Sequence, residues 1–397
     1  MPKWRIIILL AIFIGFWFNA GAQGKDKPME EQRIKLFLGG DVMTGRGIDQ
    51  ALPVSVDPVI YESYVKDARG YLQLAEKENG RIEVPVSYSY IWGDALKIWK
   101  LEEPHLKLIN LETSVTTHNE PWPGKGIQYR MHPKNVQVLT AARIDHVSLA
   151  NNHVMDWSRE GLKETLKTLK KAGIQYSGAG KDTQAAIKPA VITTEAGRIL
   201  VFSYGARTSG IPRSWEAGKD ISGVNLLTGL GKKEVREITH SIDAVKKEGD
   251  LVIFSIHWGG NWGYEIPERH KVFAHKLIDE AGVDLVFGHS SHHPIGIEVY
   301  KEKLIIYGAG DFMNDYEGIS GHEEYRPYLS LMYFPEIDMA TGRVVKLKMV
   351  PMQIKKFRLR QANERDVLWL QRVLNREGGK LGTAVISEKQ ALRLKWE

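Results

Sequence analysis

The stretch Val147-Ser-Leu-Ala-Asn-Asn-His-Val-Met-Asp156 is the part of the sequence around which we interpret the rest. Its apolar beginning predicts a buried strand, which ends in Asn151, Asn152 and His153, with Asp156 three residues later. In open α/β sheets, ligands bind just beyond the carboxyl ends of the strands. The stretch therefore predicts a functional site at the end of a buried strand.

Four other apolar runs end in side chains that can bind metals. Residues 36–40 precede Asp41, residues 106–111 precede Glu112, residues 251–256 precede His257, and residues 283–288 precede His289, with His292 and His293 close behind. Carboxylate, amide and imidazole groups suit divalent metal ions. Five strand ends that each carry such a group predict one shared metal site.

The composition narrows the class of protein. The 397 residues are 43% apolar and 26% charged, which is ordinary for a globular chain with one large domain or two unequal ones. The net charge of +6 comes without a dense block of Lys and Arg, so no nucleic-acid partner is expected. The sequence has no cysteine, so a metal site must use oxygen and nitrogen ligands.

The N-terminus predicts export. Lys3 and Arg5 precede an apolar run over residues 6–18, which is short for a membrane span, and an A-x-A pattern follows that ends at Ala22. We interpret residues 1–22 as a signal peptide and residues 23–33 as a linker, so the protein is expected to be periplasmic or secreted. The alternative is an uncleaved N-terminal membrane anchor.

Strands and helices alternate along most of the chain, and hairpins follow. We expect an α/β fold in which helices cover two sheets packed face to face. A helix capped by Ser158 is expected over residues 158–172. The aromatic-rich residues 42–104 form either a lid beside the site or a helical insertion that covers a sheet edge. The main domain spans residues 34–354, and residues 355–397 form a small appendage of one helix and one strand.

Two carboxylates, Asp41 and Glu112, are the first candidate metal ligands. A two-metal hydrolytic site needs bridging carboxylates, His or Asn ligands and an activated water. Asp41 follows two glycines, where the backbone can turn sharply, although a plain turn aspartate fits the same pattern. Glu112 follows an apolar strand, where a carboxylate is costly to bury unless it is paired or metal-bound, although it could also begin a helix. Asn110 is expected to orient it.

The first group of polar residues beside these carboxylates supplies an amide and a proton donor. Asn152 offers an amide oxygen to a metal, and His153 can donate a proton to a leaving oxygen. Asp156 can fix the tautomer of His153 by a hydrogen bond. An ordinary loop histidine would fit the position of His153 alone, but the neighbouring Asn151 and Asn152 favour a functional role.

The remaining candidates follow the later strands. The aromatic loop from Trp258 to Glu265 comes after His257 and could stack on substrate. His289 and His292 lie three residues apart and could reach one metal pair, with His293 in a supporting role or as a ligand in place of His292. Asp311 lies in a glycine-rich turn, where it either supports a metal ligand or is a simple turn residue.

Several of these residues belong to an ordered set of motifs. The motifs are Gly40-Asp-Val-Met43, Asn110-Leu-Glu112, Ala150-Asn-Asn-His153 with Asp156, His257-Trp-Gly259, Gly288-His289 with His292, and Tyr307-Gly-Ala-Gly-Asp-Phe312. Together they resemble the motif set of the CapA family, the capsule and poly-γ-glutamate synthesis proteins, whose domain is similar to calcineurin-like metallophosphoesterases. The resemblance covers roughly residues 35–334. The chain departs from the usual family pattern at Ser290, Asn261 and Asp311.

The resemblance implies a four-layer α/β/β/α sandwich with two divalent metal ions, either Mn, Zn, Fe or Mg. The implied metal ligands are Asp41, Glu112, Asn152, His257, His289 and His292. His153 would be the acid or charge stabiliser, with Asp156 behind it. The residues expected to support the ligands or contact substrate are Asn110, Asn151, Trp258, Glu265, His293 and Asp311.

Two functions are expected from this set. The first is an exported metal-dependent hydrolase that acts on a phosphoester or on an amide or ester of an anionic envelope polymer. The second is a non-catalytic, polymer-binding component of a membrane-associated assembly for capsule or poly-γ-glutamate synthesis and export. Metal binding with turnover favours the first function, and metal binding with polymer retention alone favours the second.

Overall fold

The computed structural model describes Met1 and residues 32–396, and Gln32–Glu397 form one compact unit. The expected signal peptide and most of the expected linker lie outside the described residues. Within the described part of the chain, no helix is both long enough and apolar enough to cross a membrane.

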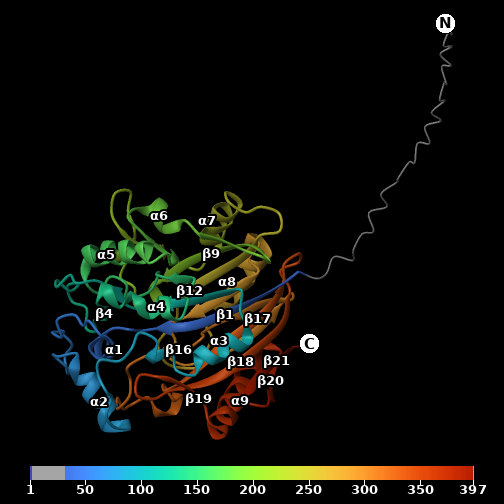
Figure 1. Cartoon of the computed structure of the whole chain (residues 1–397). Helices are drawn as coiled ribbons and strands as arrows, with labels where there is room; N and C mark the ends of the chain where they lie inside the picture. The colour runs from blue at the N-terminus through green and yellow to red at the C-terminus, as the bar shows by residue number, and fades with distance from the viewer. Residues whose placement is uncertain (2–31, 397) are drawn as a thin grey trace. The chain divides into compact units, whose positions relative to one another are not determined.

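The larger sheet has ten strands, with β1 near its centre (Figure 1). The order along the sheet is β20-β21-β18-β17-β1-β2-β5-β6, with β16 beside β1 and β19 beside β18. The strands are β1 (Arg33–Val42), β2 (Leu106–Leu111), β5 (His146–Ser148), β6 (Gln175–Ser177), β16 (Asp311–Met313), β17 (Leu329–Asp338), β18 (Val344–Ile354), β19 (Leu359–Gln361), β20 (Thr383–Glu388) and β21 (Ala391–Trp396). Strands β1, β2, β5 and β6 are parallel, so their carboxyl ends meet at one edge.

The second sheet has seven strands in the order β11-β9-β12-β13-β15-β14, with β8 beside β9. Its strands are β8 (Ala190–Thr194), β9 (Gly197–Ala206), β11 (Leu226–Leu227), β12 (Leu251–His257), β13 (Leu285–His289), β14 (Ile297–Tyr300) and β15 (Lys303–Ile306). Two short pairs complete the strands, β3 (Ser114–Val115) with β4 (Arg130–Met131) and β7 (Ala179–Gly180) with β10 (Gly223–Val224).

Helices cover the outer faces of both sheets. The larger sheet is covered by α1 (Arg46–Ala51), α2 (Arg69–Asn79), α3 (Ala95–Glu102), α4 (Gln137–Ala141) and α5 (Ser158–Lys171). The second sheet is covered by α7 (Lys232–Asp243) and α8 (Glu268–Ala281). The other helices are α6 (Thr183–Ile187) and α9 (Glu364–Gly378), and short 3-10 turns are η1 (Tyr90–Trp92), η2 (Pro133–Val136), η3 (Arg207–Ser209), η4 (Arg213–Trp215), η5 (Glu323–Tyr325) and η6 (Gly379–Leu381).

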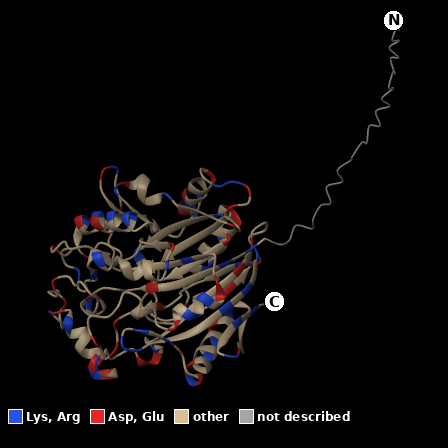
Figure 2. Ribbon diagram, in the orientation of Figure 1, with Lys and Arg blue, Asp and Glu red and all other residues tan. Residues whose placement is uncertain are grey.

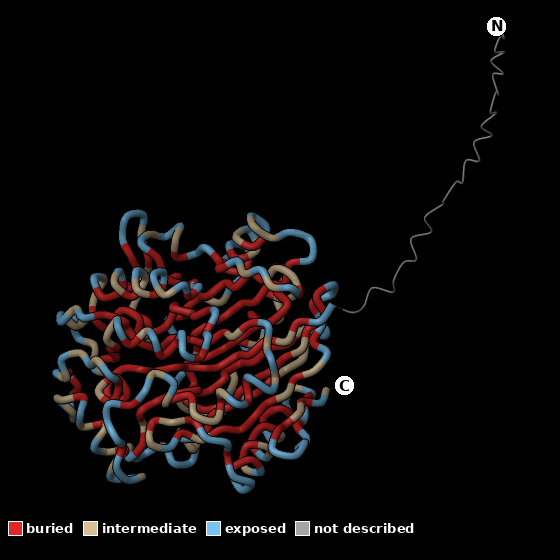
Figure 3. Tube along the Cα trace, in the orientation of Figure 1, coloured by how far each residue is buried: buried red, intermediate tan, exposed pale blue. Residues whose placement is uncertain are grey.

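The alternation of side chains along the strands builds three apolar cores. On β1, Leu36 and Leu38 face the second sheet, whereas Phe37 faces the outer helices. On β12, Ile253 lies between the sheets, and Phe254 packs with Phe273 of α8. The strands are buried and the outer surfaces of the helices are exposed (Figure 3). The expected four-layer α/β/β/α sandwich is therefore confirmed.

The region 42–104 is mainly a helical cover of the larger sheet. Trp92 and Trp99 are buried beside Phe37 and Phe312, because these large rings fill the space over the sheet. Tyr64, in contrast, is exposed and lines a pocket. The helical insertion therefore describes most of this region, and its polar loop reaches the candidate site.

The prediction that Ser158 caps α5 was wrong. The capping position is Trp157, whose side chain makes no capping hydrogen bond, and Ser158 has a positive φ of 65°. The Ser158 hydroxyl instead donates to the carbonyl of Glu120 at 3.0 Å. Because the hydroxyl contacts the loop at Glu120, it does not cap the helix. The residues next to Ser158 in the sequence do not predict this contact.

The C-terminal segment extends the larger sheet. Strand β21 pairs with β18. The expectation of a single strand here was wrong, because β19 also pairs with β18 and β20 pairs with β21. Helix α9 begins after Asn363, whose side chain accepts a hydrogen bond from the backbone of Asp366. Its residues Leu370 and Leu374 belong to the core between the sheets. Residues 355–396 thus share the sheet and core of the preceding residues.

Candidate metal centre

The candidate centre lies where parallel strands of both sheets end. Asp41 comes from the end of β1 and Glu112 follows β2, while His257 and His289 end the neighbouring strands β12 and β13 and are paired in register. An irregularity in β1 between Gly39 and Asp41 shifts its register. A Cβ at Gly40 would stand 1.7 Å from the carbonyl oxygen of Gly310, so this close approach requires glycine.

Two groups of ligand atoms share one carboxylate. Asp41, His257 and His289 form the first group, and within each group the atoms lie within 4.8 Å of one another. The second group consists of Asp41, Glu112, His292 and Asp311. All members of both groups are buried. An arrangement of two ligand groups joined by one carboxylate matches the donor set of a two-metal site.

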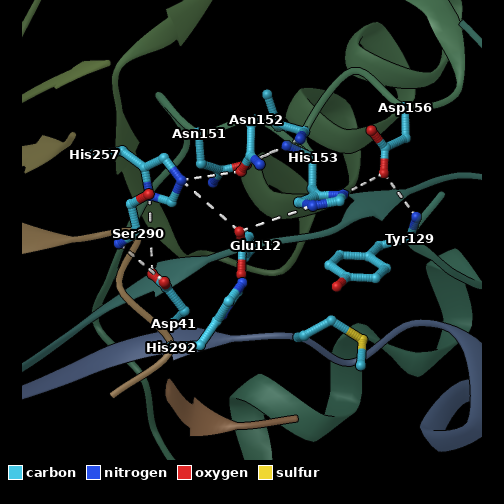
Figure 4. A network of polar contacts seen from close by, with 12 residues as sticks. Asp41, Glu112, Tyr129, Asn151, Asn152, His153, Asp156, His257, Ser290 and His292 are labelled. Atoms are coloured by element: carbon cyan, nitrogen blue, oxygen red, sulfur yellow. Dashed lines mark hydrogen bonds and ion pairs between the residues drawn. The ribbon is translucent and has the colours of Figure 1, made fainter. Parts of the chain in front are cut away.

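Hydrogen bonds fix Asp41 at the junction of the two groups. The Asn110 amide donates to Asp41 Oδ1 at 2.7 Å. The Ser290 backbone N–H donates to Asp41 Oδ2 at 3.0 Å (Figure 4). The Asn151 amide donates to Asn110 Oδ1 at 3.1 Å, so Asn151 holds Asn110. The expectation that Asn110 orients Glu112 is therefore not met in these contacts, because its amide turns to Asp41.

Asn152 joins the site through its amide oxygen. Its Oδ1 lies 2.9 Å from His257 Nε2, and the Glu112 carboxylate lies 3.8 Å from the same nitrogen. Asn152 also lines the pocket in front of the centre. The six residues implied as ligands, Asp41, Glu112, Asn152, His257, His289 and His292, are thus brought to one place, and Asp311 lies among them as a direct candidate ligand.

The charge balance of this cluster fits bound cations. Asp41, Glu112 and Asp311 are buried, and among the described residues none of them forms an ion pair with Lys or Arg within 4 Å. Burial, and then the neighbouring Asp311, raises the pKa of Asp41 to about 7. Burial, then Asp41 and Asp311, raises the pKa of Glu112 well above its ordinary value. Positive charge would relieve both effects.

Two of the cluster histidines, His257 and His289, are held in their neutral form, which is the form that binds metals. Burial works to lower the pKa of His292, but the contact with Asp311 outweighs burial and raises that pKa. Burial lowers the pKa of His289 to about 3. Burial, and then the neighbouring His289, lowers the pKa of His257 well below its ordinary value. Neutral imidazoles beside buried carboxylates form a nitrogen and oxygen donor set that suits a divalent transition metal.

A buried chain of hydroxyls orients His289. Ser255 Oγ lies 2.8 Å from His289 Nε2 and 2.7 Å from Ser148 Oγ. The chain continues through Ser203 and Ser177 to His146. Because Nε2 is bound in this way, His289 Nδ1 faces the centre, 3.9 Å from Asp41 Oδ1. A partner behind a ligating histidine fixes its ring and its tautomer.

His153 stands at the open side of the centre. Its Nδ1 lies 2.6 Å from Asp156 Oδ2, and its ring stacks on Tyr129 with centroids 3.7 Å apart. Asp156 also accepts from the Tyr129 backbone N–H at 2.7 Å and pairs with Lys125 at 3.1 Å. His153 Nε2 faces Glu112 at 4.0 Å (Figure 4). The expected contact between Asp156 and His153 is present in the structure.

A pocket of 540 Å³ opens in front of these residues. Trp262, from the loop expected to stack on substrate, lines this pocket, whereas sequence reasoning missed other wall residues, namely Arg46, Lys125, Tyr129, Thr208, Tyr316 and His322. Arg46 is buried and pairs with Glu62 at 3.2 Å and with Asp315. Lys125 follows the turn Pro123-Gly124, so a basic residue at the tip of a glycine-containing loop was the one local signal.

The remaining residues predicted to support the metal ligands or contact substrate differ in whether they lie at the pocket. Trp258 is buried in the core beside α8, its indole N–H donates to the carbonyl of Tyr307, and it does not line the pocket. Trp262, four residues later, lines it. His293 accepts from the Gly263 N–H at 3.2 Å and stacks on Tyr325. Glu265 is exposed and lies outside the pocket wall.

The chain matches one protein family and several known proteins. Residues 35–316 match the family described as "Bacterial capsule synthesis protein PGA_cap". The chain is 44% identical over 361 residues to a "Probable polyglutamine synthesis accessory protein" of Mycobacterium tuberculosis, covering 90% of this chain and 95% of that protein. It is 24% identical over 322 residues to the "Capsule biosynthesis protein CapA" of Bacillus anthracis, covering 79% of this chain and 67% of that protein.

Among solved structures, a novel phosphatase from Mycoplasma pneumoniae matches with a TM-score of 0.45 and 13% identity, covering 85% of this chain and 96% of that chain. The family match spans the strands and loops that carry Asp41, Glu112, His257, His289 and Asp311. The resemblance expected from the ordered motifs is confirmed, and the chain belongs to the bacterial capsule synthesis protein PGA_cap family.

Proposed function

We propose that this protein is an exported metal-dependent hydrolase that acts on a phosphoester or on an anionic envelope polymer in capsule or poly-γ-glutamate synthesis. The observation that carries the proposal is the pair of ligand groups that share Asp41. The names of the relatives, a polyglutamine synthesis accessory protein and a capsule biosynthesis protein, support the link to the polymer. Export rests on the signal-like sequence of residues 1–22.

Two sets of residues that share Asp41 would each hold one cation. Asp41, His257 and His289 would hold one divalent cation, with Asn152 nearby, and Asp41, Glu112, His292 and Asp311 would hold a second. Bound divalent cations supply Lewis-acid polarisation of a phosphoryl or acyl oxygen and activation of water. Asn110 and the Ser290 N–H keep Asp41 in place between the two groups.

His153 would move the proton to the leaving oxygen. Asp156 accepts from Nδ1, so Nε2 is the nitrogen that takes up and delivers the proton on the side of the centre. Burial, and then Lys125, lowers the pKa of His153 well below its ordinary value, so the ring is neutral at rest. Tyr129 stacks on the ring and keeps its plane fixed.

A lysine-lined groove favours a second function. The basic groove, lined by Lys163, Lys167, Lys170, Lys181 and Lys188, fits a polymer-binding component of a synthesis or export assembly that performs no hydrolysis. The two proposed functions differ in whether substrate is hydrolysed at the Asp41 centre.

The test combines metal content with turnover. The purified protein is supplied with Mn, Zn, Fe or Mg, its bound metal is counted by elemental analysis, and hydrolysis of a generic phosphodiester and of poly-γ-glutamate is measured. We expect about two metal ions per chain and hydrolysis that His257→Ala abolishes, while the exposed His240→Ala serves as the matched control. If the protein binds metal but turns over none of these substrates, the hydrolase proposal is wrong and the polymer-binding function is supported.

A further inference from the structure

The basic groove has an unusual charge distribution. It measures 850 Å³, is larger than the 540 Å³ pocket at the candidate centre, and has five lysines and no Asp or Glu in its wall. The whole chain, in contrast, has 54 basic and 48 acidic residues, so a wall with one sign of charge is not a consequence of composition. Basic positions recur along α5, the helix on one side of the groove (Figure 2).

Within the described part of the chain, two of the five lysines have a weak carboxylate partner and three have none. Lys163 lies 3.4 Å from Glu160, and Lys181 lies 3.9 Å from Asp182. Both lysines are exposed, so these pairs are weak. Lys167, Lys170 and Lys188 have no carboxylate within 4 Å among the described residues. Glu164 is on the same helix, but its carboxylate accepts hydrogen bonds from Thr116 and Thr117 instead.

Helix stability alone does not account for this arrangement. Lys170 and Lys171 lie in the last turn of α5, where basic residues interact favourably with the helix dipole. Lys163 and Lys167 are four residues apart on one helix face, a spacing at which like charges repel. Lys181 and Lys188 come from the segment around α6, and the fold brings them to the same groove. Negative charge from outside the chain would relieve this repulsion.

The shape and lining of the groove favour a polymer with an apolar backbone. Leu166, Ile174, Tyr176 and Val191 lie among the lysines, and the side chain of Val191 is 42% exposed. Methylene groups can cover such a surface while carboxylates reach the ammonium groups around it. Lysine acts as a flexible point charge and does not require the planar, bidentate geometry that arginine prefers.

The pocket at the centre offers no comparable surface to an anionic chain. Its two basic lining residues, Arg46 and Lys125, already form ion pairs with Glu62, Asp315 and Asp156. Helix α5 starts at Ser158, two residues after Asp156, so the groove and the His153 loop are joined by a continuous, ordered segment. The free positive charge of this region therefore lies along α5 and α6.

We infer that the basic groove binds an extended carboxylate polymer of the polyglutamate type. The inference builds on the polymer named in the proposed function but does not require hydrolysis. Lys163, Lys167, Lys170, Lys181 and Lys188 pair with successive carboxylates, and Leu166 and Tyr176 contact the chain between them. Because these pairs are exposed, the affinity falls as salt is added.

The test measures binding of fluorescent poly-γ-glutamate to the full-length purified protein by anisotropy, at low salt and at about 0.15 M salt. The groove variant combines Lys167→Gln, Lys170→Gln and Lys188→Gln. The matched control combines Lys77→Gln, Lys100→Gln and Lys232→Gln, which are exposed lysines outside the groove. We expect the groove variant to bind at least about tenfold more weakly than the parent protein and the control to bind as the parent does.

Further arms separate this inference from the proposed function. Binding is repeated with chelator and with Asp41→Asn, and both are expected to leave the affinity for the polymer unchanged. The binding result therefore does not depend on whether the protein is a hydrolase. Equal weakening in the groove and control variants would overturn the inference. Single-stranded DNA and vesicles of anionic phospholipid serve as other polyanions. If either binds as tightly as polyglutamate and with the same dependence on the three lysines, the assignment to a carboxylate polymer is wrong.

Discussion

The candidate centre and the basic groove concentrate opposite charges in opposite surroundings. At the centre, Asp41, Glu112 and Asp311 are buried together, whereas the groove lysines stand in solvent around α5 and α6. Water screens the lysines, so they repel one another only weakly, and each exposed charge contributes little to stability or binding. Water does not reach the carboxylates, so they need cations at fixed positions. Single substitutions should therefore act strongly at the centre and weakly in the groove.

The largest effect is expected from Asp41→Asn, because Asp41 belongs to both ligand groups. The substitution keeps the size of the side chain but removes the shared negative charge. We expect turnover of a phosphodiester to fall by about 10³-fold or more. Steady-state kinetics with added metal measures this, and a variant within a few-fold of the parent rate would rule out Asp41 as the shared ligand.

His153→Ala separates chemistry from metal binding. The side chain lies beside the centre but belongs to neither ligand group. We expect metal content to stay at the parent level while turnover falls by about 10²- to 10⁴-fold, which is the usual contribution of a proton donor. Elemental analysis and kinetics on the same preparation give both values. A loss of metal together with activity would instead make His153 a ligand.

Ser255→Ala tests whether the hydroxyl chain positions His289. Removal of the hydroxyl leaves His289 Nε2 without its partner at 2.8 Å. We expect metal affinity to fall by about 10- to 100-fold, as for other residues that orient a ligand. Ser330→Ala is the matched control, because Ser330 is equally buried and its hydroxyl has no hydrogen-bond partner among the described residues. Titration with a competing chelator compares the two, and equal affinities would remove the positioning role.

His146, at the far end of the same chain, is expected to affect the pH dependence of folding. Burial lowers its pKa from 6.5 to about 3, so the folded protein binds fewer protons than the unfolded chain below pH 6.5. Its contribution to stability is present above pH 6.5 and is lost as the pH falls, by about 1.4 kcal/mol for each unit of pH.

Urea unfolding of chelated protein at pH 7 and pH 5 tests this expectation. In His146→Gln the loss of stability between the two pH values should be smaller than in the parent protein by about 2 kcal/mol. The exposed His240→Gln should lose as much as the parent. An identical slope in all three proteins would show that His146 is not held neutral by the fold.

The smallest effect is expected in the groove. Lys167→Gln removes one exposed charge that has no carboxylate partner within 4 Å among the described residues. We expect its free energy of unfolding to stay within about 0.5 kcal/mol of the parent value, and turnover of a small phosphodiester to be unchanged. A large loss in either quantity would break the contrast between the two regions.

The sequence predicted the strands and their ends better than the contacts behind them. Asp41, Glu112, His257 and His289 follow apolar runs, so their meeting at one edge could be foreseen from parallel strand order. The chain of hydroxyl contacts behind His289 could not be foreseen, because Ser148, Ser177, Ser203 and Ser255 stand on four separate strands. Each one alone is an ordinary strand residue.

Other features depend on which way a side chain turns. Trp258 and Trp262 lie in one aromatic loop, and only the fold decides that the first enters the core and the second lines the pocket. Asp311 reads as a turn residue in its glycine-rich stretch, but the parallel pairing of β16 with β1 brings it opposite Asp41. Likewise, the spacing of Lys163 and Lys167 is visible in the sequence, whereas their approach to Lys188 is not.

The central claim is that the two ligand groups hold a pair of cations through one carboxylate, and metal stoichiometry tests it most directly. The parent protein and Asp41→Asn are purified alike, supplied with Mn or Zn, dialysed, and analysed for bound metal per chain. The account predicts about two ions per chain in the parent and fewer than one in the variant. Equal metal content in both proteins, or none in the parent, would contradict it.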